Sequence, residues 1–337
     1  MRKTLTLLAL LMMGTSIASA QQDPMFTNYM FNALTFNPAY AGSNGHMVIN
    51  ALHRSQWVGI EGAPTTQTLT IHSPLKSDRV GVGFSFVNDK IGATNAMNFN
   101  GAYAYRIPVG KGHLAIGLQA SMNNWRADWG RLTYADGQQS DPAFAGNPNS
   151  WKFNFGAGIY YSTKRFYTGL SVPRVIENDL TQNRIDQLPF YAKQYRHFYY
   201  TLGGAIPIKG DALVFKPSLL VKAVSVDSRF KKDSSFSKVG APIQFNVDLS
   251  LLFQQMLWIG ASFRSSVEAF TGKDAGKSSF DSVDFWAAYN LSSGLRLGVG
   301  YDYSLTKIQS KTVGSFEIMA GWEFDYRVKR VVTPRYF

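Results

Sequence analysis

Apolar residues alternate with small or polar residues through most of this chain, and this period of two constrains the fold more than any other feature. Val80, Val82 and Phe84 alternate with glycine and serine, and similar segments recur up to residue 326. A period of two places successive side chains on opposite faces of a β-strand. We count about fourteen such segments of roughly ten residues, a length that crosses a bilayer at a tilt. The sequence therefore predicts an all-β fold, a single-domain transmembrane antiparallel β-barrel. The expected strands are residues 46–53, 65–72, 79–88, 96–107, 113–126, 152–162, 166–172, 197–207, 213–226, 242–254, 256–265, 282–291, 295–305 and 314–326.

The segments between these strands alternate in length, which indicates a barrel independently. Outer-membrane barrels have short turns on the periplasmic side and longer loops outside. An even number of strands then places both termini in the periplasm. The short links are residues 108–112, 163–165, 208–212, 255 and 292–294, and the longer ones are 54–64, 127–151, 173–196, 227–241, 266–281 and 306–313.

Composition agrees with a barrel in an outer membrane. Aromatic residues make up 14% and charged residues only 17% of the chain, whereas soluble domains average about 25% charged residues. The net charge is +12, but the basic residues are dispersed along an exported chain. We therefore expect attraction to outer-membrane lipid and lipopolysaccharide or to an acidic partner protein, and no nucleic-acid partner. A plain excess of exposed basic residues on loops explains the charge equally well.

The first twenty residues predict a signal peptide. Arg2 and Lys3 precede a short apolar run at residues 5–13, and Ala18-Ser19-Ala20 forms a small-residue cleavage site. An N-terminal anchor is the alternative, although the apolar run is too short to span a bilayer. The chain has no cysteine, which excludes a lipid-modified cysteine and any disulfide framework.

Residues 21–45 carry the one clear helical period after the signal peptide. Five apolar residues recur at helical spacing, and the turn formers Asn37-Pro38 and residues 42–45 follow them. Asp23 and Pro24 suit the cap and first turn of a helix. The sequence predicts a short helix and hook at the periplasmic side, docked against or inside a barrel formed by residues 46–337. The apolar residues at helical spacing are Phe26, Tyr29, Met30, Ala33 and Leu34.

A search for catalytic chemistry finds no candidate residues. The five histidines have no metal-ligand spacing, and neither a nucleophile elbow nor a phosphate-binding loop is present. We predict no enzyme activity, no cofactor and no metal site.

Charged residues at inward-facing positions are the main candidate feature of the barrel wall. Charges inside a barrel should pair with one another or with water. They could brace the wall as an internal salt-bridge network, or they could bind a plug or a passing chain. The inward-facing charges are Arg106, Lys216, Lys222, Asp248, Arg264, Asp284, Arg296, Asp302, Glu317 and Glu323.

Two aromatic residues, Tyr134 and Phe144, lie well inside a long loop. Exposed aromatic side chains are common anchors of protein interfaces. Contact with a partner and packing within the loop both explain them.

Several motifs resemble one known family. Residues 23–29 read D-P-x-F-x-x-Y and residues 37–43 read N-P-A-Y-A-G-S, and W-V-G…G-A-P at 57–64 and G-L-S-V-P at 169–173 follow. Together they are similar to the PorP/SprF outer-membrane proteins of the type IX secretion system of the Bacteroidota. The resemblance spans roughly the whole chain after the signal peptide.

The resemblance implies a non-enzymatic part of that secretion machinery. SprF-like members assist export or surface attachment of a secreted partner with a type B C-terminal domain, often a gliding adhesin. PorP-like members act with periplasmic ring components of the core apparatus, which is the alternative here. A passive solute channel is a rival of another class. The residues expected at a partner or plug interface are Asp23, Pro24, Phe26, Tyr29, Asn37, Pro38, Tyr40 and Gly42. A plug that only stabilises the barrel would use the same residues.

Overall fold

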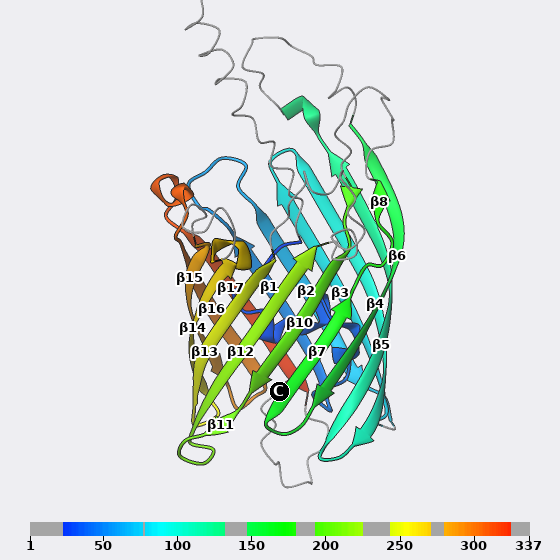
Figure 1. Cartoon of the computed structure of the whole chain (residues 1–337), viewed down its shortest axis with the longest axis vertical. Coiled ribbons are helices and arrows are strands. Elements are labelled where there is room, and N and C mark those ends of the chain that lie inside the picture. The colour runs from blue at the N-terminus through cyan, green and yellow to red at the C-terminus, as the bar shows by residue number, and fades with distance from the viewer. Residues whose placement is uncertain are drawn as a thin grey trace, which may run out of the picture.

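The computed structural model describes residues 23–76, 78–131, 147–179, 193–224, 243–270 and 280–324, and within them the strands close into one antiparallel barrel (Figure 1). Each strand pairs with its neighbours in the sequence, and β17 pairs with β1 to close the ring. β11 (Ile206–Pro207) continues β10 on the same partner, so fourteen strands form the wall. The predicted fold class is confirmed. The wall strands are β1 (Met47–Ser55), β2 (Thr65–Pro74), β3 (Val80–Ile91), β4 (Thr94–Val109), β5 (Gly112–Ala127), β6 (Asn149–Ser162), β7 (Phe166–Val172), β10 (His197–Gly204), β12 (Leu213–Val224), β13 (Gln244–Phe253), β14 (Leu257–Ser266), β15 (Ser282–Asn290), β16 (Leu295–Ser304) and β17 (Ser315–Phe324).

The two ends of the barrel differ, as the connection lengths predict. The link between β4 and β5 is two residues long, Gly110 and Lys111, and it lies at the lower end in Figure 1. We call this the short-turn end and the opposite one the long-loop end. A small hairpin of β8 (Asn178–Asp179) and β9 (Lys193–Gln194) lies beyond the long-loop end of β6 and β7. The predicted signal peptide (residues 1–20), Tyr134 and Phe144 lie outside the described residues.

The wall is apolar outside and polar or small inside, because the side chains follow the period of two. On β5, Leu118 is 60% exposed, whereas its neighbours Gly117 and Gln119 are buried in the lumen. On β17, Phe316 and Ile318 face outward while Glu317 is buried inside. An outward apolar band around a polar interior is the arrangement of a barrel in lipid. Every helix in the described part of the chain is too short or too polar to cross a bilayer.

The outward band supports a direct test of lipid exposure. Leu118→Arg should destabilise the barrel by about 2–4 kcal/mol, the cost of a basic side chain near the bilayer midplane. Urea unfolding of the protein in lipid vesicles measures this difference. Leu118→Phe, which keeps an apolar surface, is the matched control and should change stability little. Equal stability of Leu118→Arg and Leu118→Phe would contradict a lipid-facing position.

The predicted N-terminal helix is wrong in detail, because the segment forms three short 3-10 turns inside the lumen. These are η1 (Tyr29–Phe31), η2 (Ala33–Thr35) and η3 (Pro38–Tyr40). Phe31 and Phe36 lie off the predicted apolar face, yet they are as deeply buried as the residues on it. A segment enclosed by a barrel wall has contacts on every side, so a single apolar stripe does not determine its conformation.

The sequence predicts this hook, and with it the N-terminal end of the barrel protein, at the periplasmic, short-turn side, but the first described residue, Asp23, lies at the long-loop end. The segment runs through the whole lumen, from Asp23 at the long-loop end of β10 to Gly42 beside β2 and β3 at the short-turn end. We call residues 23–45 the plug.

Further 3-10 turns lie at the long-loop end: η4 (Trp129–Arg131), η7 (Val267–Ala269) and η8 (Lys307–Lys311).

Candidate functional site

The plug begins in a cluster of polar wall residues at the long-loop end. The Asp23 carboxylate forms an ion pair with Arg174 and accepts a 2.9 Å hydrogen bond from the Tyr199 hydroxyl. The Asp23 N–H donates to His197 Nε2 at 3.3 Å, and Lys222 Nζ donates to the Asp23 carbonyl at 2.8 Å. Burial would raise the pKa of Asp23, but the charges of Arg174 and Lys222 and the hydrogen bond from Tyr199 hold this pKa well below its usual range. The carboxylate therefore stays charged and fixes the start of the plug.

Glu317 on β17 holds the next part of the plug by its backbone. Its carboxylate accepts the Thr27 N–H at 3.0 Å, the Asn28 N–H at 2.8 Å and the Asn28 side-chain amide at 2.6 Å. Arg54 lies 3.6 Å from the same carboxylate, and its Nη1 donates to the Thr27 hydroxyl at 3.0 Å. All four residues are buried. The buried charge of Glu317 is thus satisfied by the plug as much as by the wall.

The acidic and basic residues around Glu317 continue as a chain of ion pairs. Arg54 pairs with Asp302 at 2.6 Å, and Arg264 bridges Asp302 at 3.2 Å and Asp284 at 2.8 Å. Sequence reasoning missed Arg54, because the expected strand ended at residue 53. Every second residue of β1 faces inward, and this alternation continues to residue 54. Extending the expected strand by one residue would therefore have identified Arg54.

Loss of the Glu317 carboxylate should weaken the plugged barrel strongly. Glu317→Ala leaves Arg54 without one partner and the two plug N–H groups without acceptors, and breaking a buried pair of this kind costs about 3–5 kcal/mol. The measurement is urea unfolding in lipid vesicles. Glu317→Gln keeps the shape and one acceptor oxygen, and it should lose less. If Glu317→Ala were as stable as the wild type, Glu317 would not be an anchor.

Aromatic packing holds the middle of the plug. Phe31 packs edge-on against Trp258, with ring centroids 4.7 Å apart, and against Trp286 at 5.8 Å. Asn50 donates to the Phe31 carbonyl at 3.0 Å, and the Tyr29 hydroxyl is 2.7 Å from Ser218 Oγ. Phe26, Tyr29 and Phe36 form a second buried cluster with the wall residues Leu52, Tyr199 and Leu220.

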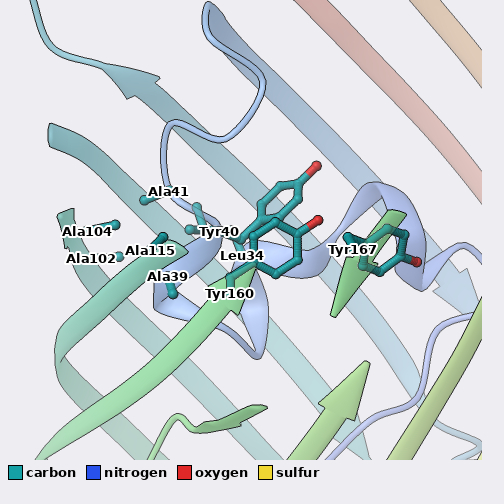
Figure 2. Close-up of a cluster of buried hydrophobic side chains, with 9 residues drawn as sticks. All are labelled: Leu34, Ala39, Tyr40, Ala41, Ala102, Ala104, Ala115, Tyr160 and Tyr167. Atoms are coloured by element: carbon teal, nitrogen blue, oxygen red, sulfur yellow. The ribbon is translucent and has the colours of Figure 1, made fainter. Parts of the chain in front are cut away.

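The end of the plug lies in a cluster of small and aromatic residues, which Figure 2 shows. Asn37 caps η3 by accepting the Ala39 N–H at 3.0 Å, and Pro38 follows at the first position of the turn. Tyr40 packs edge-on against Tyr160, with centroids 5.5 Å apart, and Leu34 lies in the same cluster. The alanines that allow this approach are Ala39, Ala41, Ala102, Ala104 and Ala115.

Inward-facing glycines let the plug approach the backbone of the wall. A Cβ on Gly81 would overlap the Ala41 carbonyl, and a Cβ on Gly117 would overlap the backbone of Ala39. Gly42 has φ +72 and donates its N–H to His72 Nδ1 at 3.2 Å, while Arg106 donates to its carbonyl at 2.9 Å. The wall is therefore shaped to this part of the plug.

All ten predicted lumen charges face inward, and the contacts among the described residues include several ion pairs and hydrogen bonds. Arg296 pairs with Glu323 at 2.5 Å, and Glu323 also contacts His46 at 3.1 Å. Asp248 accepts hydrogen bonds from Trp286 and Ser262, both at 2.7 Å. The Lys216 ammonium lies 3.5 Å over the Trp258 ring. Lys222 and Arg106 donate to the plug carbonyls of Asp23 and Gly42.

The eight residues expected at a partner or plug interface all belong to the plug. Pro24 and Asp23 are half-buried, and the remaining six are buried in the lumen. The contacts described above are to the barrel of the same chain, and a role in binding a partner stays a prediction. In the described ranges no group of three or more His, Asp or Glu side chains could hold a metal ion.

A cavity of about 440 Å³ remains between the plug and the wall, and its lining comes from β1, β6 and β7 as well as from strands between β10 and β17. Plug residues Tyr29 and Phe31 line one side, and Lys216, Asp248 and Trp258 line the other. Gln255, Asn290 and Gly294, in the turns of the short-turn end, form its rim. The cavity therefore opens at the short-turn end.

Comparison with known proteins gives one family and several structural relatives. The profile of the family described as type IX secretion system membrane protein PorP/SprF matches residues 18–322. This match confirms the resemblance seen in the motifs. No curated protein matches the sequence.

Among solved structures, the chain is similar to Omp33 of Acinetobacter baumannii, with 10% identity, a TM-score of 0.45, and coverage of 83% of this chain and 98% of that chain. A FadL homologue of Pseudomonas aeruginosa gives 11% identity and a TM-score of 0.44, covering 83% and 90%. BamA of Haemophilus ducreyi lacking POTRA domains 1–3 gives 12% identity and a TM-score of 0.42, covering 82% and 70%.

Proposed function

Because this chain belongs to the PorP/SprF family of type IX secretion system membrane proteins, and is therefore an outer-membrane component of that system, we propose that it assists export and surface attachment of a secreted partner protein. The partner carries a type IX C-terminal domain of type B, as a gliding adhesin does. The barrel acts by binding and performs no catalysis.

The plug is the observation that carries this proposal. It occupies the lumen from Asp23 to Gly42, and an ion pair at Asp23, hydrogen bonds and aromatic contacts hold it along its length. A solute channel needs an open water-filled path, whereas these contacts favour a closed barrel. A closed barrel offers its two ends as binding surfaces.

The two ends would then serve different partners. The long loops hold the secreted protein at the cell surface, and the short-turn end faces the periplasm, where ring components of the secretion apparatus could contact it. The dispersed positive charge, +12 for the whole chain, favours lipopolysaccharide around the barrel.

Affinity purification of the tagged protein from native outer membranes, followed by mass spectrometry, tests the proposal. We expect a large surface protein that ends in a type IX signal domain. Periplasmic ring components without such a protein would support a role in the core apparatus instead. A barrel recovered alone, together with solute-specific flux in liposomes, would support a passive channel and contradict the proposal.

A further inference from the structure

Basic side chains gather on one part of the rim at the short-turn end of the barrel, the lower end in Figure 1. They lie in the four links between β2 and β3, β4 and β5, β6 and β7, and β10 and β12, which follow one another around the ring. The links between β13 and β14 and between β15 and β16 are neutral. We call the six exposed basic residues of the four links the basic crescent. They are Lys76, Arg79, Lys111, Lys164, Arg165 and Lys209.

Acidic residues do not balance the basic crescent. The same four links contain two of them, Asp78 and Asp211. The ion pairs among the described residues use none of the six basic side chains. Neighbouring strands lie about 4.8 Å apart, so successive links recur roughly every 10 Å along the rim. This spacing is close to the Debye length of about 10 Å in 0.1 M salt, and the six charges therefore act together as one positive surface.

Each basic link begins or ends where the outward apolar band ends. An apolar residue that is 41–56% exposed lies within two positions of a basic one in every link. Long basic side chains keep their aliphatic stems against apolar surroundings and extend the charged group to the boundary. The basic crescent therefore lies at the level where acyl chains give way to lipid headgroups. The four apolar residues are Leu75, Val109, Phe166 and Ile208.

We propose that the basic crescent binds the phosphate groups of anionic phospholipids in the leaflet at the short-turn end. Lysine and arginine form strong charge-assisted hydrogen bonds with phosphate oxygens. Each basic side chain near an anionic membrane surface adds about a fivefold preference for binding there. The excess of basic over acidic residues selects an anionic lipid such as phosphatidylglycerol over the zwitterionic phosphatidylethanolamine.

An acidic protein is the other class of partner that a positive surface attracts. The apolar residues beside every basic link favour lipid, because they hold the basic side chains at the bilayer surface, where headgroups surround the barrel. The assignment to the periplasmic leaflet rests on the orientation in the proposed function. The preference for anionic lipid rests on the rim alone and is independent of any role in secretion.

The first test measures which lipid the full-length protein retains. The protein is placed in nanodiscs with equal amounts of phosphatidylglycerol and phosphatidylethanolamine, and native mass spectrometry counts the lipids that stay bound after release. We expect the wild type to retain phosphatidylglycerol preferentially. The crescent variant should lower the ratio of the two retained lipids at least fivefold, the contribution of one basic residue. It combines Lys111→Gln, Lys164→Gln, Arg165→Gln and Lys209→Gln.

A control variant removes the same number and kinds of basic residues at the long-loop end, where all four are exposed. Nanodiscs carry the same lipids in both leaflets, so this control separates the basic crescent from a general effect of charge. It should change the ratio of retained lipids less than the crescent variant does. Equal losses in the two variants, or a wild type without preference, would overturn the proposal. The control combines Lys90→Gln, Arg126→Gln, Lys307→Gln and Lys311→Gln.

A soluble polyglutamate peptide is the probe for an acidic protein. Its binding is measured by fluorescence anisotropy on both variants in nanodiscs of phosphatidylethanolamine and phosphatidylcholine. If the crescent variant lost polyglutamate binding but kept the wild-type ratio of retained lipids, the basic crescent would be a protein-binding surface and the proposal would be wrong. Loss of the lipid preference in the crescent variant supports the proposal.

Cysteine labelling of intact cells tests the leaflet separately, because the natural chain contains no cysteine. Ser293→Cys places a thiol in the neutral link between β15 and β16, and Ser310→Cys places one in η8 at the long-loop end; both positions are exposed. A maleimide on a polyethylene glycol chain too large for porins should label Ser310→Cys directly and Ser293→Cys only after the outer membrane is permeabilised. Direct labelling of Ser293→Cys would contradict the periplasmic leaflet, whereas the proposed function is tested by the partner that copurifies.

Discussion

Deletion of residues 23–45 is expected to turn a closed barrel into an open pore. The plug crosses the lumen and is bonded to β10 and β12 on one side and to β17, β1 and β2 on the other. The ring of fourteen strands would keep its backbone hydrogen bonds without the plug, because every wall strand pairs with two neighbours. Planar bilayers containing the wild type should show no regular conductance steps. The deletion should show discrete conductance steps, because the barrel would then have a water-filled lumen.

A second variant guards against a deletion that does not fold. Asp23→Asn combined with Glu317→Gln keeps the whole plug but weakens its two charged anchors. This variant should give brief openings rather than a permanent pore. Heat-modified mobility in gels verifies that each barrel is assembled. Assembled deletion protein with no conductance would show that wall side chains close the lumen by themselves, and it would remove the main support for a plugged scaffold.

The strands of the barrel wall could be predicted from the sequence because each strand is marked by the alternation of residues within its own segment. A period of two, read segment by segment, gave the expected strands within a few residues of those observed. β4, for example, begins at residue 94 rather than 96 and β6 at 149 rather than 152. The same alternation of inward and outward side chains predicted Glu317 and Asp248 inside the lumen, where the structure has them.

The course of the plug could not be predicted in the same way. Its partners come from strands distant in sequence: Glu317 is 290 residues from Thr27, and Lys222 is 199 residues from Asp23. Such contacts depend on the curvature and register of the closed wall, which no local pattern records. The apolar residues from Phe26 to Leu34 pack in different clusters, Phe26 beside Tyr199 and Leu34 beside Tyr160, so their spacing does not mark one buried helical face. Glycines at inward positions of neighbouring strands, such as Gly117 and Gly158, were the available signal of a close backbone approach.

Gly117→Val should release the lower half of the plug from the wall. A side chain at this position would overlap the backbone of Ala39, which cannot yield without moving η3. Overpacking of a buried site costs about 1–3 kcal/mol. If that cost falls on the docked state of the plug, the fraction of molecules with the plug displaced should rise roughly 5- to 100-fold, since about 1.4 kcal/mol is a factor of ten.

Cysteine labelling measures this displacement directly, because the natural chain contains no cysteine. Ala39→Cys places a single thiol at a fully buried position, where a polar maleimide should react slowly. The thiol should react roughly 5- to 100-fold faster when Gly117→Val is added, in proportion to the displaced fraction.

Gly101→Val is the matched control for this experiment. Gly101 lies on the outward face of β4, and a Cβ there meets no atom within 4 Å. The same change of residue should therefore leave the thiol protected, because it adds volume outside the wall instead of under the plug. Equal labelling rates with Gly117→Val and Gly101→Val would mean that the plug does not depend on the inward glycines. A protected thiol with Gly101→Val and a reactive one with Gly117→Val would show that glycine at this wall position is required to keep the plug docked.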